Sequence, residues 1–168
     1  RGPLGHCFDL TSRDDRFHQE SWEKAETTMQ KKALSFALNK AGLTTEQLDY
    51  VLAGDLLNQC IATSYSMRTQ EIPFFGLYGA CSTMAEGLSL GAMLIDGGFA
   101  SYTAALTSSH FCSAERQYRN PLEYGGQKPP TAQWTTTGAG AVILSRKGDG
   151  PPVTQRTNRK IVEKGITG

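Results

Sequence analysis

Four side chains that can bind ligands or react lie next to the ends of predicted strands: Asp55, Cys81, His110 and Cys112. When strands run parallel, their carboxyl ends meet at one edge of the sheet, and ligands bind outside that edge. A carboxylate, an imidazole and a thiol placed there could hold a small polar ligand, or the thiol could act as a nucleophile. We predict these four residues to be ligand-binding, and we predict no catalytic set, metal site or cofactor.

Cys81 lies in a tight corner at residues 79–82, between a predicted strand and a predicted helix. The apolar run at 72–78 is typical of a buried strand, and a helix pattern follows at 82–96. A thiol at a helix N-terminus is expected to have a lowered pKa, although such a position also binds anions without covalent chemistry. The corner resembles the turn that exposes a catalytic nucleophile, except that Thr83 replaces the second glycine of that pattern.

The other candidate residues follow two further predicted strands, at 50–54 and 102–110. Asp55 comes at the point where a helix toward Met67 is expected to begin, so it could cap that helix or face a ligand. As a ligand-binding residue it would repel a bare carboxylate, but it could face a ligand-bound Ca²⁺. His110 and Cys112 fall at the end of the later strand.

The helix that follows Cys81 has almost no polar face. A helix that is apolar all round is expected to be buried at the centre of a protein. Gly87 and Gly91 lie one turn apart on one side, so another backbone could approach closely there. Gly97 and Gly98 are expected to end the helix.

The remaining elements indicate an α/β fold with a mainly parallel sheet. A first helix is predicted between a Ser21 cap and Gly42, and Thr44 with Gln47 forms a capping box. Its apolar residues recur at steps of three and four and predict one buried face: Trp22, Ala25, Met29, Ala33, Phe36, Ala37 and Ala41. A loop is predicted at 114–131, serving as an exposed connection or as the cover of a pocket. A strand, a glycine-rich bend and a second strand are predicted at 134–144, and a further strand at 153–161.

Length and composition are typical of one globular domain. The net charge is +1, from 17 basic and 16 acidic residues, which argues against a general nucleic-acid-binding protein. The four cysteines form no Cys-x-x-Cys pair, so we expect reduced thiols in an intracellular compartment. The sequence has neither a signal-peptide pattern nor an apolar stretch of membrane-spanning length. Both ends look truncated, and we expect residues 1–168 to form a single domain.

The sequence resembles the N-terminal half of the thiolase-like superfamily, which includes thiolases and ketoacyl synthases. The resemblance rests on the corner at 79–82 heading an apolar helix, on Gly97-Gly98, and on the run at 137–144. Longer runs at 2–9, 53–60 and 107–115 resemble the stage V sporulation protein AD family of spore-forming bacteria. The resemblance covers nearly the whole chain.

This resemblance implies a thiolase-like fold, of which the chain would form one half of a duplicated structure with a buried central helix. It implies non-catalytic binding of dipicolinic acid, alone or as its Ca²⁺ complex, for uptake into the developing spore. It also implies a peripheral place at the inner membrane of the forespore or spore, with other proteins of the dipicolinate channel complex as partners.

The alternative function is acyl transfer with Cys81 as nucleophile, because Cys81 matches the nucleophile position of the superfamily. Those enzymes take their catalytic histidines from the second half of the duplicated fold, and His110 does not occupy that position. In the family the helix after Cys81 packs against an equivalent helix of the second half. We therefore expect this chain to self-associate through that helix.

Overall fold

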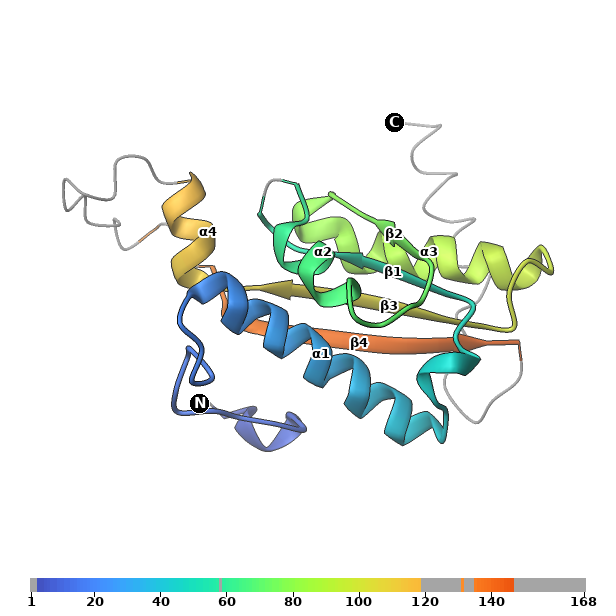
Figure 1. The fold of residues 1–168 in the computed structure, drawn as a ribbon, viewed down its shortest axis with the longest axis horizontal. Coiled ribbons are helices and arrows are strands. Elements are labelled where there is room, and N and C mark those ends of the chain that lie inside the picture. Colours follow the sequence, from blue (N-terminus) through green and yellow to red (C-terminus); the bar gives the residue numbers. More distant parts are fainter. Residues whose placement is uncertain (1–2, 58, 119–130, 132–134, 147–168) are drawn as a thin grey trace.

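The computed structural model describes residues 3–57, 59–118, 131 and 135–146. In this part of the chain, helices cover both faces of a four-stranded sheet, whose strand order is β2-β1-β3-β4 (Figure 1). The α-helices are α1 (Trp22–Ala41), α2 (Ile61–Met67), α3 (Thr83–Asp96) and α4 (Phe111–Tyr118). The strands are β1 (Tyr50–Gly54), β2 (Phe74–Gly76), β3 (Tyr102–Ser109) and β4 (Gly138–Ser145). Short 3-10 turns lie at Gly5–Cys7, Thr45–Gln47 and Ala80–Ser82.

The sheet is mixed but mainly parallel, as the order of elements predicts. β1 pairs in parallel with β2 and with β3, whereas β4 runs antiparallel to β3. Parallel pairing needs crossovers, and α2 and α3 provide them. The carboxyl ends of β1, β2 and β3 therefore share one edge of the sheet, which is called the carboxyl edge below.

Side-chain alternation along the two central strands separates the core into two layers. Val51 and Ala53 face α1, where they pack with Leu34 and Leu38. Leu52, between them, faces α3 on the other side of the sheet. All these residues except Leu38 are at most 2% exposed, which makes β1 the best-buried strand of the described part.

The predicted ends of the first helix are confirmed. Ser21 accepts a hydrogen bond from the Lys24 amide at the start of α1, and Gly42 ends that helix in the left-handed conformation. Thr44 and Gln47 form the predicted capping box. The predicted buried face of α1 is partly wrong, because Phe36 is exposed. Two polar side chains take part in the buried face instead, which consists of Ala25, Glu26, Met29, Gln30, Leu34 and Leu38.

The prediction that the helix after Cys81 is buried all round is wrong. α3 buries one narrow face made mostly of small residues, namely Thr83, Gly87, Gly91 and Ile95. A Cβ at Gly91 would lie 2.8 Å from the Thr103 hydroxyl, so the glycines let the helix approach the sheet closely. On the outer face Leu90 and Met93 are 37% and 58% exposed. The predicted close approach is therefore real, but it is made to this chain's own sheet.

Two predictions about β2 and α2 also need correction. The run at 72–78 does not form a buried strand, because β2 has three residues and lies at the edge of the sheet with Phe74 and Phe75 exposed. An edge strand has a neighbour on one side only, which explains the exposure. The helix expected to begin near Asp55 starts at Ile61, after an irregular loop.

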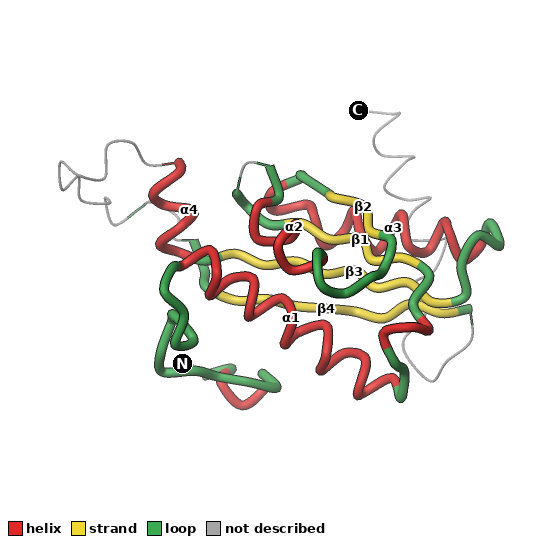
Figure 2. Tube along the Cα trace, in the orientation of Figure 1, coloured by secondary structure: helices red, strands yellow, loops and turns green. Residues whose placement is uncertain are grey.

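The end of the described chain differs from the prediction as well. Residues 114–118 of the loop predicted at 114–131 belong to α4, and residues 119–130 of it lie outside the described residues. The glycine-rich stretch at 138–140 begins β4 where a bend is predicted (Figure 2). The predicted strand at 153–161 lies outside the described residues. No helix among the described residues has both the length and the apolar composition needed to cross a bilayer.

We expect the chain to self-associate through the outer face of α3, since burial of Leu90 and Met93 would remove apolar surface from water. Sedimentation velocity over a range of concentrations measures this directly. The double variant Leu90→Gln/Met93→Gln should shift the chain toward monomer. Tyr65→Gln, which changes an equally exposed side chain on α2, is the control and should leave the association unchanged. A wild-type chain that stays monomeric at every concentration would contradict the prediction.

Candidate functional site

The predicted site residues follow the carboxyl edge, as the strand order requires. Asp55 comes directly after β1, Cys81 lies in the corner between β2 and α3, and His110 directly follows β3. Cys112 lies in the first turn of α4, which stands beside this edge next to the end of β3 (Figure 1). The sequence thus predicts the correct edge, but the four side chains have different surroundings.

Asp55 is buried and bound by the protein itself. Its Oδ1 accepts the Leu57 amide at 2.8 Å, and its Oδ2 accepts the Thr63 amide at 2.8 Å and the Thr63 hydroxyl at 2.6 Å. Thr63 belongs to the first turn of α2, whose preceding residue, Cys60, provides no side-chain cap. Asp55 therefore satisfies one amide in the first turn of α2, that of Thr63, from a position outside the helix. Both oxygens accept protein donors, and the residue is 2% exposed.

Cys81 is exposed and lies in a turn held by its neighbours. The Gly79 amide donates to the Thr83 hydroxyl, which in turn donates to the Ala80 carbonyl oxygen at 2.9 Å. Ser82 donates to the Gly79 carbonyl oxygen. Ala80 has a φ of 48°, in the left-handed region that non-glycine residues rarely adopt. The corner is therefore a tight, hydrogen-bonded turn that leaves the Cys81 side chain open to solvent.

His110 is completely buried and caps α4. Its Nδ1 accepts the Cys112 amide, so the ring proton lies on Nε2, which donates to the Asp15 carbonyl oxygen at 3.0 Å. This bond fixes the N-terminal segment against α4. Cys112 is half-buried, and burial raises the pKa of its thiol, with a further contribution from the Asp15 charge. The structure thus gives His110 a structural role in the described chain.

A pair of tyrosines at the same edge is absent from the sequence-based prediction. The hydroxyl groups of Tyr78 and Tyr118 are 2.6 Å apart, and the Tyr118 hydroxyl donates to the Leu56 carbonyl oxygen. The pair therefore joins the segments that follow β1, β2 and β3. Desolvation, followed by the hydrogen bond with Tyr78, raises the pKa of Tyr118 to about 12, so its hydroxyl remains a donor at neutral pH. A helical prediction for 111–118 would have placed Tyr118 one turn beyond Ala114, near the edge.

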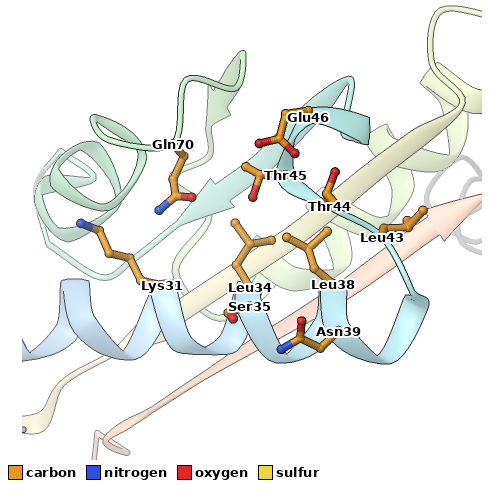
Figure 3. A pocket seen from close by; sticks show the side chains of 10 residues that line it. All are labelled: Lys31, Leu34, Ser35, Leu38, Asn39, Leu43, Thr44, Thr45, Glu46 and Gln70. Atoms are coloured by element: carbon orange, nitrogen blue, oxygen red, sulfur yellow. The ribbon is translucent and has the colours of Figure 1, made fainter.

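A surface hollow of about 490 Å³ lies elsewhere (Figure 3). It is bounded by the C-terminal half of α1, the turn at 43–46 and Gln70. Because that turn precedes β1, the hollow lies at the amino ends of the parallel strands, away from Asp55. None of the four predicted site residues lines it. We therefore place the candidate site at the carboxyl edge, around Cys81 and the tyrosine pair. In the described segments, no group of three or more His, Cys, Asp or Glu side chains could hold a metal ion.

Comparison with solved structures identifies the fold. The chain is similar to 3-oxoacyl-[acyl-carrier-protein] synthase III from Aquifex aeolicus, with a TM-score of 0.56 and 22% identity over 73% of this chain and 39% of the other. It is also similar to β-ketoacyl-[acyl carrier protein] synthase III from Thermus thermophilus, with a TM-score of 0.55 and 17% identity over 74% and 38% of the two chains. At these identities the likeness concerns the fold, which is thiolase-like.

Comparison of sequences identifies the family. The chain is 47% identical over 166 residues to stage V sporulation protein AD of Bacillus subtilis, covering 99% of this chain and 49% of the relative. It therefore spans about half the length of that protein. The family model for stage V sporulation protein AD matches residues 1–168. The chain belongs to the stage V sporulation protein AD family.

Proposed function

We propose that the chain contributes the N-terminal half of a spore protein that binds dipicolinate without catalysis. Family membership supports this proposal, and within this chain the partners of the histidines agree with it. A cysteine nucleophile needs a general base, which is most often a histidine. The chain has three histidines, and each has another partner in the structure. His6 contacts the Cys7 thiol, His18 pairs with Asp14, and His110 is buried and hydrogen-bonded through both ring nitrogens.

The carboxyl edge has features suited to a flat aromatic dicarboxylate. Tyr78 and Tyr118 are about half exposed, so they offer aromatic ring surface to such a ligand, while the Tyr118 hydroxyl already donates to Leu56. Cys81 follows Tyr78 by three residues and is exposed. Asp55 and His110 contribute indirectly, because Asp55 fixes the start of α2 and His110 fixes the start of α4. If Ca²⁺ takes part, we propose that it arrives bound to the ligand, since the described residues contain no group of three or more His, Cys, Asp or Glu side chains that could hold it.

The family gives the proposal its setting in the spore. We propose that the chain, together with the rest of its protein, associates peripherally with the inner membrane through other proteins of a dipicolinate channel complex. Family membership is the support for this step, and co-purification of those proteins from sporulating cells would test it.

Acyl transfer through Cys81 is the second candidate function. It is favoured by the exposure of the Cys81 thiol and by the fold shared with the two synthases. A histidine base would then have to come from outside this chain, because each of its three histidines is engaged elsewhere. A mass increase of one acyl group on Cys81 after incubation with acyl-coenzyme A would support this alternative.

Substitutions of Cys81 should separate the two functions. Because the side chain is exposed, neither Cys81→Ser nor Cys81→Leu should lower stability by more than about 0.5 kcal/mol, so affinity reports on the ligand. For a binding protein, Cys81→Ser should retain most of the affinity for dipicolinate, and Cys81→Leu should lose about tenfold or more because the added bulk obstructs the ligand, roughly 1.4 kcal/mol. Titration calorimetry in Ca²⁺ and in chelator measures both.

Cys7→Leu is the matched control, since Cys7 is also exposed but lies in the N-terminal segment. It should bind like wild type. Absence of dipicolinate binding to the wild-type protein in both conditions would refute the proposed function. Turnover of acyl-coenzyme A that disappears in the Cys81→Ser variant would instead establish the enzyme.

A further inference from the structure

A buried polar cluster lies between α1 and the carboxyl edge, outside the proposed ligand site. Glu26 and Gln30 lie one turn apart on the buried face of α1 and are 1% and 0% exposed. A buried carboxyl group is costly unless it is neutral or well bonded. The partners of Glu26 therefore indicate which of these conditions holds.

The side-chain amide of Gln30 joins two series of hydrogen bonds. Gln30 Nε2 donates to Thr63 Oγ1 at 3.0 Å and to Ser108 Oγ at 2.8 Å, which uses both of its hydrogens. The Thr63 hydroxyl donates onward to Asp55 Oδ2, and the Ser108 hydroxyl donates to Glu26 Oε1 at 2.7 Å. Glu26 is thereby connected, through Ser108, Gln30 and Thr63, to the carboxylate of Asp55 at the start of α2.

The second oxygen of Glu26 lacks a donor of its own. The Ser113 hydroxyl lies 3.3 Å from Glu26 Oε2 and 3.2 Å from the His110 carbonyl oxygen, and its single hydrogen cannot serve both fully. A proton on Oε2 removes this conflict. Glu26 then donates to Ser113, and Ser113 donates to His110.

The charged groups around Glu26 do not favour its ionised form. β3, β4 and α2, which pack against α1 or border it, carry no acidic or basic residue. In α4, Arg116 pairs with Glu23, and Glu115 accepts a hydrogen bond from Thr135. His110 is held by the Asp15 carbonyl oxygen and the Cys112 amide. The loop after β1 contributes a like charge, Asp55.

We propose that Glu26 is a proton-binding site that clamps α1 to the segments after β1 and β3, and that loss of its proton loosens the start of α2. This inference does not depend on dipicolinate binding. It makes the geometry of the carboxyl edge sensitive to pH through a buried group and not through the exposed tyrosines or Cys81.

The electrostatics agree with the geometry. Burial raises the pKa of Glu26 from 4.5 to about 7, the Ser108 hydrogen bond opposes this shift, and the Asp55 charge adds to it. A pKa that is higher in the folded than in the unfolded state stabilises the fold at low pH. This contribution is complete below the unfolded pKa and is lost as the pH rises to about 7.

The test compares the wild-type chain with Glu26→Gln, which keeps the shape of the side chain but cannot titrate. Urea denaturation gives the unfolding equilibrium constant of each protein across this pH range. The ratio of the wild-type constant to the variant constant should rise about tenfold per pH unit between roughly pH 5 and 7 and then level off. Glu20→Gln, which changes an exposed glutamate just before α1, is the control and should run parallel to wild type over that range. Parallel curves for Glu26→Gln would overturn the proposal.

Two further measurements test the connection to α2. Amide hydrogen exchange of Leu57 and Thr63, corrected for the intrinsic effect of pH, should accelerate above about pH 7 in wild type and not in Glu26→Gln. If Leu57 and Thr63 are equally protected from exchange in both proteins, the proton on Glu26 does not affect the start of α2, and the proposed clamp is refuted. If Glu26→Gln does not fold, carbon-13 NMR of the wild-type glutamate carboxyls decides: one should titrate near 7, and titration of all of them near 4.5 would refute the site.

Discussion

Gly54→Ala is expected to prevent the chain from folding, with a loss of more than about 4 kcal/mol in the free energy of unfolding. Gly54 ends β1, and a Cβ there would overlap the Leu77 carbonyl oxygen and lie 2.6 Å from Thr83 Cγ2. The carbonyl oxygen belongs to backbone that is fixed, because the Leu77 amide donates to Ala53 at 2.8 Å. The added methyl group would therefore push the Cys81 corner away from β1.

Gly76→Ala is the matched control, because Gly76 ends the neighbouring strand β2. There the nearest atoms to a new Cβ are Phe74 Cε2 at 3.8 Å and Cys60 Sγ at 3.9 Å, which are ordinary contacts. Its effect should stay within about 1 kcal/mol. Circular dichroism with urea denaturation compares the two variants. A cooperatively folded Gly54→Ala protein with near wild-type stability would show that the corner can move.

Local signals in the sequence correctly predict both ends of α1 and the capping box that follows it. Ser21, Gly42 and the Thr44–Gln47 box act through neighbours within four residues, so their roles are readable from the sequence. Burial of α3 depends instead on what covers its second face. Its glycines let the sheet approach one side, but hydrophobic composition alone gives no information about a neighbour on the other side.

At the site, too, local position is predictable from the sequence whereas tertiary contacts are not. The position of Asp55 after a parallel strand predicts the correct edge, yet its burial depends on Thr63 in the next helix. Gln30 and Ser108 are 78 residues apart, and Ser108 and Glu26 are 82 apart. Such partners meet only through the tertiary fold, so no local pattern marks Glu26 as a buried group. The one local signal is that Glu26 lies four residues before Gln30 and eight before Leu34, a spacing that places all three on one face of α1.

Asp55→Asn should destabilise the chain by about 3 kcal/mol, because a neutral amide replaces a buried carboxylate that accepts three hydrogen bonds. The asparagine can place its one oxygen toward Thr63 or toward Leu57. Its NH₂ group then faces an N–H donor that has lost its acceptor. Thr63→Val keeps the Thr63 amide bond but removes the hydroxyl that donates to Asp55 and accepts from Gln30, and it should cost about 2 kcal/mol, less than Asp55→Asn. Equal effects of the two substitutions would contradict this role of the carboxylate.

The same variant decides whether Asp55 contacts Ca²⁺ brought in by a ligand. A bridging carboxylate would make Asp55→Asn weaken dipicolinate binding more in Ca²⁺ than in chelator. The sequence suggests that Asp55 faces a ligand-bound Ca²⁺. The structure argues against this role, since both carboxylate oxygens of Asp55 accept protein donors and the side chain is buried. We expect Asp55→Asn to weaken binding equally in the two conditions, through the loosened start of α2. A loss confined to Ca²⁺ would mean that Asp55 leaves Thr63 to bind the ion, and Thr63→Val should then increase Ca²⁺-dependent affinity because it weakens the competing bond.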